Sequence, residues 1–258
     1  MTAYTFETIT EAQAAAFTAG DTLTFTTPGS TASQVRVTFT PASGGSGIPP
    51  SPVIPARTTL TFNGISREFP AASLAGYGGF TGQINFPDGS MLYPGTASAD
   101  TVQGSGFGDG LYGDEGSDSL AGGDGDDFLQ GNSGADTLSG GAGNDSVYGG
   151  RDSDRIDLGA GDNWANGNIG ADTVIGGAGH DTLLGGQDGD ELRAGEGANY
   201  LSGDLGADTL TSGSGADTLL GGDGADSLSA GAGANRLAGA TGADTLVSGA
   251  GADTLTGG

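Results

Sequence analysis

Apolar residues recur every nine positions through the last two-thirds of the chain. From residue 95 to residue 256, 18 consecutive nonapeptides follow one another without insertion or deletion, and their eighth position is Val, Ile or Leu in 17 of them, with Ala165 as the exception. The spacing predicts a short three-residue strand in each unit, whose middle side chain points inward. One unit cannot bury its single aliphatic residue, so the units must stack around a continuous core.

The first third of the chain has a different pattern, in which apolar and polar residues alternate as they do in half-buried strands. This alternation predicts strands over 22–27, 35–40, 58–62 and 83–86, with turns at 62–65 and 86–90. Residues 11–17 are rich in helix formers and predict one short helix. Residues 41–56 contain mainly Pro, Gly and Ser and predict a flexible loop or linker. We therefore expect a small β-rich domain over 1–94 and a repeat domain over 95–258.

The full consensus of the repeat is G-G-x-G-x-D-x-U-x, where U is aliphatic. Glycine at positions one, two and four predicts a sharp turn with positive φ. Asn and Asp tolerate such φ values next best, and they replace glycine at position two. These replacements are Asp114, Asn132, Asn168 and Asp204.

Charge is concentrated in the repeats. The chain carries a net charge of −25, has no Cys and has Arg as its only basic residue besides His180. Residues 95–258 hold 27 of the 32 acids. This balance excludes nucleic acid as a default partner, because phosphate binding needs clustered cations, and it favours metal cations instead.

The repeats resemble the RTX family of calcium-binding nonapeptide proteins. The segments GGAGNDSVY (140–148), GGAGHDTLL (176–184) and GGDGADSLS (221–229) are close matches to its motif. The resemblance implies an all-β fold, a parallel β-roll of about nine 18-residue coils with two sheets. It also implies several Ca²⁺ ions between loops 18 residues apart, held by position-six side chains and loop carbonyls. Nine coils at a strand spacing of roughly 4.8 Å would form a rod about 40 Å long.

Alternate repeats place their sixth residue on opposite sides of such a roll, which gives two columns of candidate calcium ligands. The Asp column contains Asp100, Asp118, Asp136, Asp154, Asp172, Asp190, Asp208, Asp226 and Asp244. The mixed column contains Asp109, Asp127, Asp145, Asn163, Asp181, Asn199, Asp217, Asn235 and Asp253.

All three asparagines lie in the mixed column, 36 residues apart. An amide can still bind calcium through its oxygen, but the site loses one negative charge, so we expect weaker binding there. The alternative is that a 36-residue unit was duplicated together with its drift. Five losses of the first glycine also fall in this column, at Leu158, Ala194, Ser212, Ala230 and Ser248.

A few other side chains are candidates for function. Trp164 and Tyr200 occupy outward positions 36 residues apart and could form a contact surface, or Trp164 could simply pack over the small Ala165. Asp152 and Asp188 replace the fourth glycine, as extra ligands or as turn residues. His180 is interpreted as a solvated loop residue.

The sequence favours a non-enzymatic protein, since residues 1–94 lack His, Cys and any recognisable catalytic motif. The resemblance extends to self-assembling RTX surface-layer proteins of Gram-negative bacteria. The chain stops in mid-repeat without a polar cap, so we expect calcium-dependent, head-to-tail assembly with copies of itself. The alternative is a calcium-dependent adhesion or glycan-binding module that holds a cell-surface polysaccharide.

The chain shows neither a transmembrane segment nor a Sec-type signal, so we expect no membrane insertion. The family resemblance implies an extracellular location and export by type I secretion. The C-terminal export signal usual in such proteins is not visible, so it is embedded in the last repeats, has been removed, or lies beyond a fragment. Without calcium the stacked acids should repel one another, so we expect folding to be coupled to calcium binding.

Overall fold

The computed structural model describes strands within residues 3–5, 22–24, 36–40, 57–62 and 65–70, and then residues 84–86 and 89–258. The predicted helix over 11–17 and the predicted loop over 41–56 lie outside the described residues. Among the described residues the structure is all-β, with no helix and hence none long and apolar enough to cross a bilayer.

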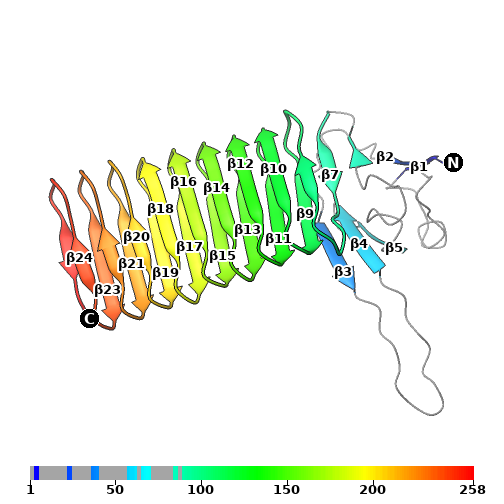
Figure 1. Cartoon of the computed structure of the whole chain (residues 1–258). Coiled ribbons are helices and arrows are strands. Elements are labelled where there is room, and N and C mark those ends of the chain that lie inside the picture. Colours follow the sequence, from blue (N-terminus) through cyan, green and yellow to red (C-terminus); the bar gives the residue numbers. More distant parts are fainter. Residues whose placement is uncertain are drawn as a thin grey trace, which may run out of the picture.

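The repeats form a roll of two parallel sheets (Figure 1). The nine-stranded sheet contains β8 (Thr101–Gln103), β10 (Ser119–Asp124), β12 (Thr137–Ala142), β14 (Arg155–Ala160), β16 (Thr173–Ala178), β18 (Glu191–Glu196), β20 (Thr209–Thr211), β22 (Ser227–Ser229) and β24 (Thr245–Val247). The eleven-stranded sheet contains β6 (Ile84–Asn85), β7 (Met91–Tyr93), β9 (Gly110–Glu115), β11 (Phe128–Ser133), β13 (Ser146–Arg151), β15 (Trp164–Ile169), β17 (Thr182–Gln187), β19 (Tyr200–Leu205), β21 (Thr218–Asp223), β23 (Arg236–Thr241) and β25 (Thr254–Thr256).

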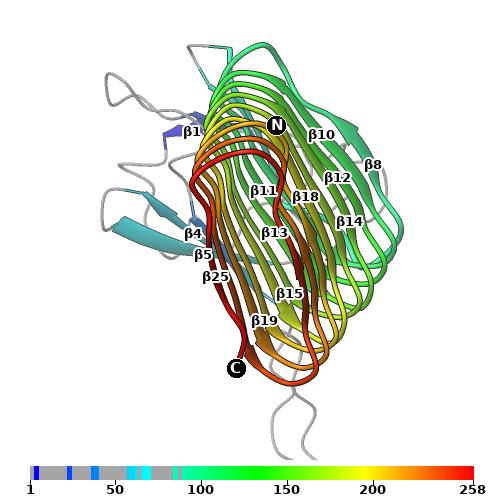
Figure 2. The ribbon, with the colours of Figure 1, turned by 90° about the vertical axis from the view of Figure 1, so that its left-hand side faces the viewer.

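The register of the strands confirms the predicted coil of 18 residues. Each strand of the repeats pairs in parallel with the strand 18 residues away, as Leu120 of β10 pairs with Leu138 of β12, whereas β6 at the edge pairs antiparallel with β7. Seen along its axis, the roll shows its coils superimposed on one another, with the two sheets facing each other (Figure 2). The predicted β-roll is therefore confirmed.

Most strands are six residues long, so the prediction of three-residue strands was too short. A strand such as β12 covers positions seven to nine of one nonapeptide and one to three of the next. Its two inward residues are Leu138 at position eight and Gly140 at position one, both buried. The sequence pattern did not reveal the second half of the strand, because a glycine carries no side chain whose polarity could mark it as inward.

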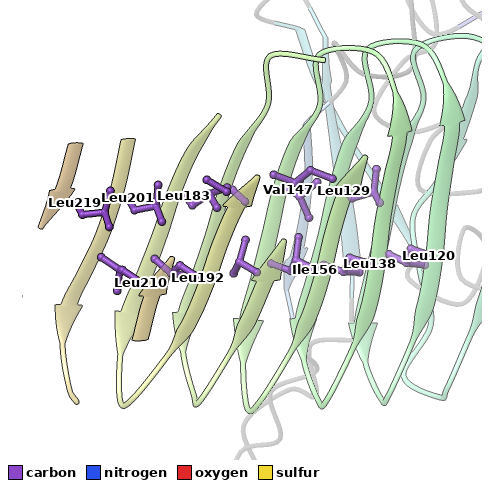
Figure 3. Close-up of a cluster of buried hydrophobic side chains, with 14 of the residues drawn as sticks. Leu120, Leu129, Leu138, Val147, Ile156, Leu183, Leu192, Leu201, Leu210 and Leu219 are labelled. Atoms are coloured by element: carbon purple, nitrogen blue, oxygen red, sulfur yellow. The ribbon is translucent and has the colours of Figure 1, made fainter. Parts of the chain in front are cut away.

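One aliphatic side chain from each strand fills the core between the sheets. Figure 3 shows these side chains in two rows, one from each sheet, and Leu120, Leu129 and Leu138 are each 0–1% exposed. Leu158 at position one also points inward and is fully buried, as is the small Ala165 of the same repeat. The core is thus one-dimensional, and each coil contributes only a few side chains to it.

The N-terminal region contributes short strands and a hairpin. β3 (Arg36–Thr40), β4 (Arg57–Phe62) and β5 (Ile65–Pro70) form an antiparallel sheet, and β1 (Ala3–Thr5) pairs in parallel with β2 (Thr22–Thr24). Strands were therefore confirmed within all four predicted ranges, whereas β1, β5 and β7 were missed. At the predicted turn over 86–90, the Phe86 nitrogen donates a hydrogen bond to the Ser90 oxygen between the antiparallel strands β6 and β7, and residues 87 and 88 lie outside the described residues. β7 then pairs in parallel with β9, so the eleven-stranded sheet continues across the expected domain boundary.

Candidate metal sites

Short loops connect the two sheets and place every position-six residue along one of two sides of the roll. The loops that end at the Asp column precede strands of the nine-stranded sheet, and those of the mixed column precede strands of the eleven-stranded sheet. All 18 position-six side chains predicted as ligands lie in these loops. All are buried except Asp100, Asp244 and Asp253, which are half-buried.

From Asp118 and Asp127 onward, one oxygen of each position-six side chain links neighbouring coils. Its Oδ1 atom accepts a hydrogen bond from the backbone N–H of the position-six residue one coil earlier. On the Asp column Asp136 Oδ1 lies 2.8 Å from the Asp118 nitrogen, and on the mixed column Asp145 Oδ1 lies 2.9 Å from the Asp127 nitrogen. The same bond recurs through both columns at 2.7–3.1 Å. The side chain therefore has a structural role in addition to any role in metal binding.

The other oxygen of most position-six aspartates has no donor. Twelve Oδ2 atoms are buried without a hydrogen-bond partner, and they belong to Asp118, Asp127, Asp136, Asp145, Asp154, Asp172, Asp181, Asp190, Asp208, Asp217, Asp226 and Asp244. A buried carboxylate oxygen without a donor or cation is costly. Its repetition at 18-residue intervals is what a column of cation sites predicts.

The electrostatics of the columns lead to the same conclusion. Burial raises the pKa of both Asp127 and Asp154 to about 8, and that of Asp190 to about 7. The hydrogen bond to Oδ1 lowers these pKa values, and the carboxylates of neighbouring coils raise them further. The charged form of these groups thus lacks a positive partner within the protein.

The first coil differs from those that follow it. Asp100 accepts hydrogen bonds from the backbone nitrogen and Oγ1 of Thr96 at 2.9–3.0 Å. Asp109 accepts one from the hydroxyl of Ser105 at 2.9 Å. Neither Thr96 nor Ser105 was singled out in the sequence, although both are hydroxyl residues at position two, where later repeats have Gly, Asn, Asp or Ala.

The residues present fit calcium. Among the described residues no three His, Cys, Asp or Glu side chains converge on a single point, so carboxylates alone do not build a site. Two neighbouring loops of the Asp column supply two carboxylates, and beyond Asp145 two neighbouring loops of the mixed column supply one carboxylate and one amide. Backbone carbonyl oxygens of the same loops would complete the shell. Ca²⁺ takes six to eight oxygen ligands of this mixed kind, and its charge would supply the missing partner of the Oδ2 atoms.

Glycine at position one is needed for space, and beyond Gly95 (φ 77°) it does not have the positive φ that the sequence led us to expect. A Cβ atom at Gly113 would lie 2.2 Å from Asp118 Oδ2, and one at Gly131 would lie 2.1 Å from Asp136 Oδ2. Neither glycine has a positive φ. Positive φ does occur at positions two and four, as predicted for Asp114, Asn132, Asn168 and Asp204 (φ 69–79°).

The remaining candidates lie in the turns, and a ligand role for Asp152 and Asp188 stays a prediction. Asp152 and Asp188 have φ of 72° and 73° and are exposed, as expected of residues that replace a turn glycine. His180 is exposed, but its Nδ1 accepts a hydrogen bond from the Ala198 nitrogen at 2.8 Å. The position-five side chains next to the mixed column thus form a second ladder of hydrogen bonds between coils, which was not predicted from the sequence. Its signal was a polar residue at each 18-residue step, at Asp126, Asn144, Asp162 and His180.

The two candidate interface aromatics differ in environment. Trp164 is half-buried, and its ring centroid lies 4.7 Å from that of Tyr148. That pair continues a row of rings through Phe128 to Tyr112 along the eleven-stranded sheet. Tyr200 is 39% exposed. A contact of either residue with a partner stays a prediction.

Comparison with known proteins agrees with this geometry. The family model for the RTX calcium-binding nonapeptide repeat matches seven overlapping segments that together span residues 94–255, which is well over half of the chain. No curated protein matches the sequence. The nonapeptide register, the parallel roll and the unpaired carboxylate columns all agree with this match, and the chain belongs to the RTX family of calcium-binding repeat proteins.

Proposed function

We propose that this chain is a secreted structural protein that folds when its two columns bind calcium, and then assembles head to tail with copies of itself into an extracellular filament or surface layer. The observation that carries the calcium-dependent part is the set of twelve buried Oδ2 atoms without a donor. RTX rolls are typically structural and non-catalytic, and RTX repeats are typical of proteins secreted by Gram-negative bacteria. Export by the type I route belongs to this proposal.

The edge strands of the described roll are the surfaces that this proposed assembly would use. Among the described strands, β24 and β25 each pair with one neighbour only, and so does β8 at the other end of the nine-stranded sheet. Val247 on β24 is 54% exposed, and Leu255 on β25 is 46% exposed. In the proposed assembly, a second copy stacks its β8 on β24, which pairs these two strands and places its first coil against the coil that carries Val247 and Leu255. Such a contact joins unlike surfaces and propagates into an open polymer.

The first test is calcium removal. Far-UV circular dichroism should show a β-rich fold with Ca²⁺ and loss of that fold in EGTA, while Mg²⁺ at the same concentration should not restore it, because it demands a smaller octahedral shell. A spectrum that is identical with and without calcium would contradict calcium-coupled folding.

The second test is the assembly state. Negative-stain microscopy of the calcium-loaded protein should show filaments or sheets, and Val247→Asp combined with Leu255→Asp should abolish them without changing the spectrum. Leu205→Asp is the matched control, because Leu205 is 50% exposed on the side of the roll. Filaments that persist in the double variant would exclude this stacking surface.

The second candidate function is an adhesion or glycan-binding module, and the exposed ring of Tyr200 on the eleven-stranded sheet is the observation that favours it. Aromatic faces supply apolar contact area at binding surfaces. Monodisperse rods in the microscope, together with retention of the wild type but not of Tyr200→Ser on immobilised cell-surface polysaccharide, would favour this function over assembly.

A further inference from the structure

The asparagines of the mixed column make a contact that no aspartate can make. Their Oδ1 atoms accept the N–H one coil earlier, as those of the aspartates do, at 2.8–2.9 Å. Their Nδ2 atoms donate to backbone carbonyls of their own loop. Asn199 Nδ2 lies 3.2 Å from the Gly197 oxygen and 3.4 Å from the Gly195 oxygen.

The other two asparagines repeat this contact. Asn235 Nδ2 lies 3.2 Å from the Gly231 oxygen and 3.4 Å from the Gly233 oxygen, and Asn163 Nδ2 lies 3.1 Å from the Gly161 oxygen. The orientation of each amide is determined by its partners. Exchanging oxygen and nitrogen would set an NH₂ group against a backbone N–H and an oxygen against the carbonyls.

The loop carbonyls are the oxygens that would complete a calcium shell, so the amide hydrogens occupy acceptors that an ion would otherwise use. In an aspartate loop the second side-chain atom is an acceptor without a donor, as for Asp181 and Asp217 on either side of Asn199. In an asparagine loop the second side-chain atom is Nδ2, which donates to carbonyl oxygens of the loop. The asparagine side chain therefore satisfies itself, whereas the aspartate needs a cation to satisfy its Oδ2.

A second observation, at position one, is independent of these hydrogen bonds. All three asparagine repeats carry a side chain there, namely Leu158, Ala194 and Ala230. Of the 15 aspartate repeats, 13 have glycine at this position, and only the Ser212 and Ser248 repeats do not. At twelve of these 13 glycines an added Cβ would lie 2.0–2.5 Å from the Oδ2 of the same repeat.

In the repeats with glycine at position one, a Cβ atom there and the carboxylate would compete for the same space. The Ser212 repeat, which keeps Asp217, shows that the competition is not absolute. All three asparagine repeats have a side chain at position one, and their amides bond to the loop. The paired change at positions one and six gives the 36-residue rhythm a physical reason, which random drift in a duplicated unit would not supply.

We propose that Asn163, Asn199 and Asn235 substitute for bound calcium, so that the mixed column beyond Asp145 keeps its loops closed with fewer ions than the Asp column. This inference rests on the proposed calcium-binding function. The loops of the Asp column would then need bound calcium to close, whereas the loops of the mixed column would close partly through the hydrogen bonds of their own asparagines.

The test restores one standard repeat with Ala194→Gly and Asn199→Asp together. Equilibrium dialysis should then show more calcium bound per chain than in the wild type. Folding followed against calcium concentration should become steeper, because that slope counts the ions taken up on folding. Asn144→Asp is the matched control. It adds the same charge to the same column, and its Oδ1 acceptor for the Asp162 nitrogen survives the change.

A second pair of variants places the asparagine in the Asp column, and it tests the inference even if the first variant does not fold. On the Asp column, Gly203→Ala with Asp208→Asn and Gly203→Ala with Asp208→Ala both remove one carboxylate. The asparagine variant should fold at a calcium concentration several-fold lower than the alanine variant, because only its amide can donate to the loop carbonyls.

Equal calcium counts and equal slopes for the wild type and the restored repeat would overturn the inference, as would equal calcium requirements of the two Asp208 variants. A wild type that binds no calcium at all would instead contradict the proposed function, and that result is visible before any variant is compared.

Discussion

At the scale of single residues, the position-six aspartate divides its two oxygens between two tasks. Oδ1 joins one coil to the next through a backbone N–H, whereas Oδ2 is buried without a donor. The arrangement depends on position one, since a Cβ atom there would overlap Oδ2. Glycine at position one, two residues after the core residue of the same strand, therefore leaves room for the carboxylate in most repeats.

Gly131→Ala tests this dependence. The added Cβ would lie 2.1 Å from Asp136 Oδ2 and 2.6 Å from the Gly149 oxygen, so we expect a loss of about 1–3 kcal/mol in unfolding free energy, as overpacking usually costs. Urea unfolding in saturating calcium measures it. Gly106→Ala is the control, because nothing lies within 4 Å of a Cβ there, and it should leave stability nearly unchanged. An equal loss in both variants would refute the steric account.

At the scale of the element, one strand holds only one aliphatic side chain in most coils, and the sheet ladders connect each coil to the next. Leu138 of β12 lies in register with Leu120 and Ile156 of its neighbours and is fully buried. The core has no second layer that could fill a gap. Truncation of one such leucine should therefore leave a cavity that neighbouring coils cannot close.

Leu138→Ala should lower the unfolding free energy by about 2–5 kcal/mol, the range found for buried leucines. Thermal or urea unfolding with calcium present measures the change. Leu205→Ala on β19 removes the same atoms from a side chain that is 50% exposed, so it should cost less than about 0.5 kcal/mol. A small effect of Leu138→Ala would mean that the coils shift to refill the core.

At the scale of the whole molecule, the roll stacks like charges along two lines. Burial raises the pKa of the column aspartates, to about 8 for Asp127 and Asp154 and to about 6 for Asp118, Asp136, Asp145, Asp172 and Asp208. The folded chain without metal therefore binds protons more tightly than the unfolded chain does. Protons and calcium are two ways to supply the same missing positive partner.

Acid should consequently replace calcium in part. Because the folded-state pKa values lie above the ordinary value of 3.8, this contribution to stability is present at low pH and is lost as the pH rises through about 6 to 8. Protein freed of calcium on a chelating resin should show more β structure by circular dichroism at pH 5.5 than at pH 8. A calcium-free chain that is better folded at pH 8 would contradict this sign.

The sequence by itself determined the nine-residue period, the core at position eight and the regular Asp or Asn at position six, because these features recur at a fixed local spacing. The 18-residue coil and the two sheets were expected from the resemblance to the RTX family, and the strand register confirmed them. The alternation in the first third likewise located strands at 36–40 and 57–62.

Only the tertiary structure decided which atoms of neighbouring coils contact one another. It showed that strands continue through the glycines, that Gly131 leaves room for a carboxylate, that Oδ1 serves the neighbouring coil, and that Asn199 bonds its own loop. It also joined the hairpin of β6 and β7 to the roll. These features arise from contacts between residues 18 apart and from the absence of a side chain, and neither has a signature in the hydrophobic pattern of a single repeat.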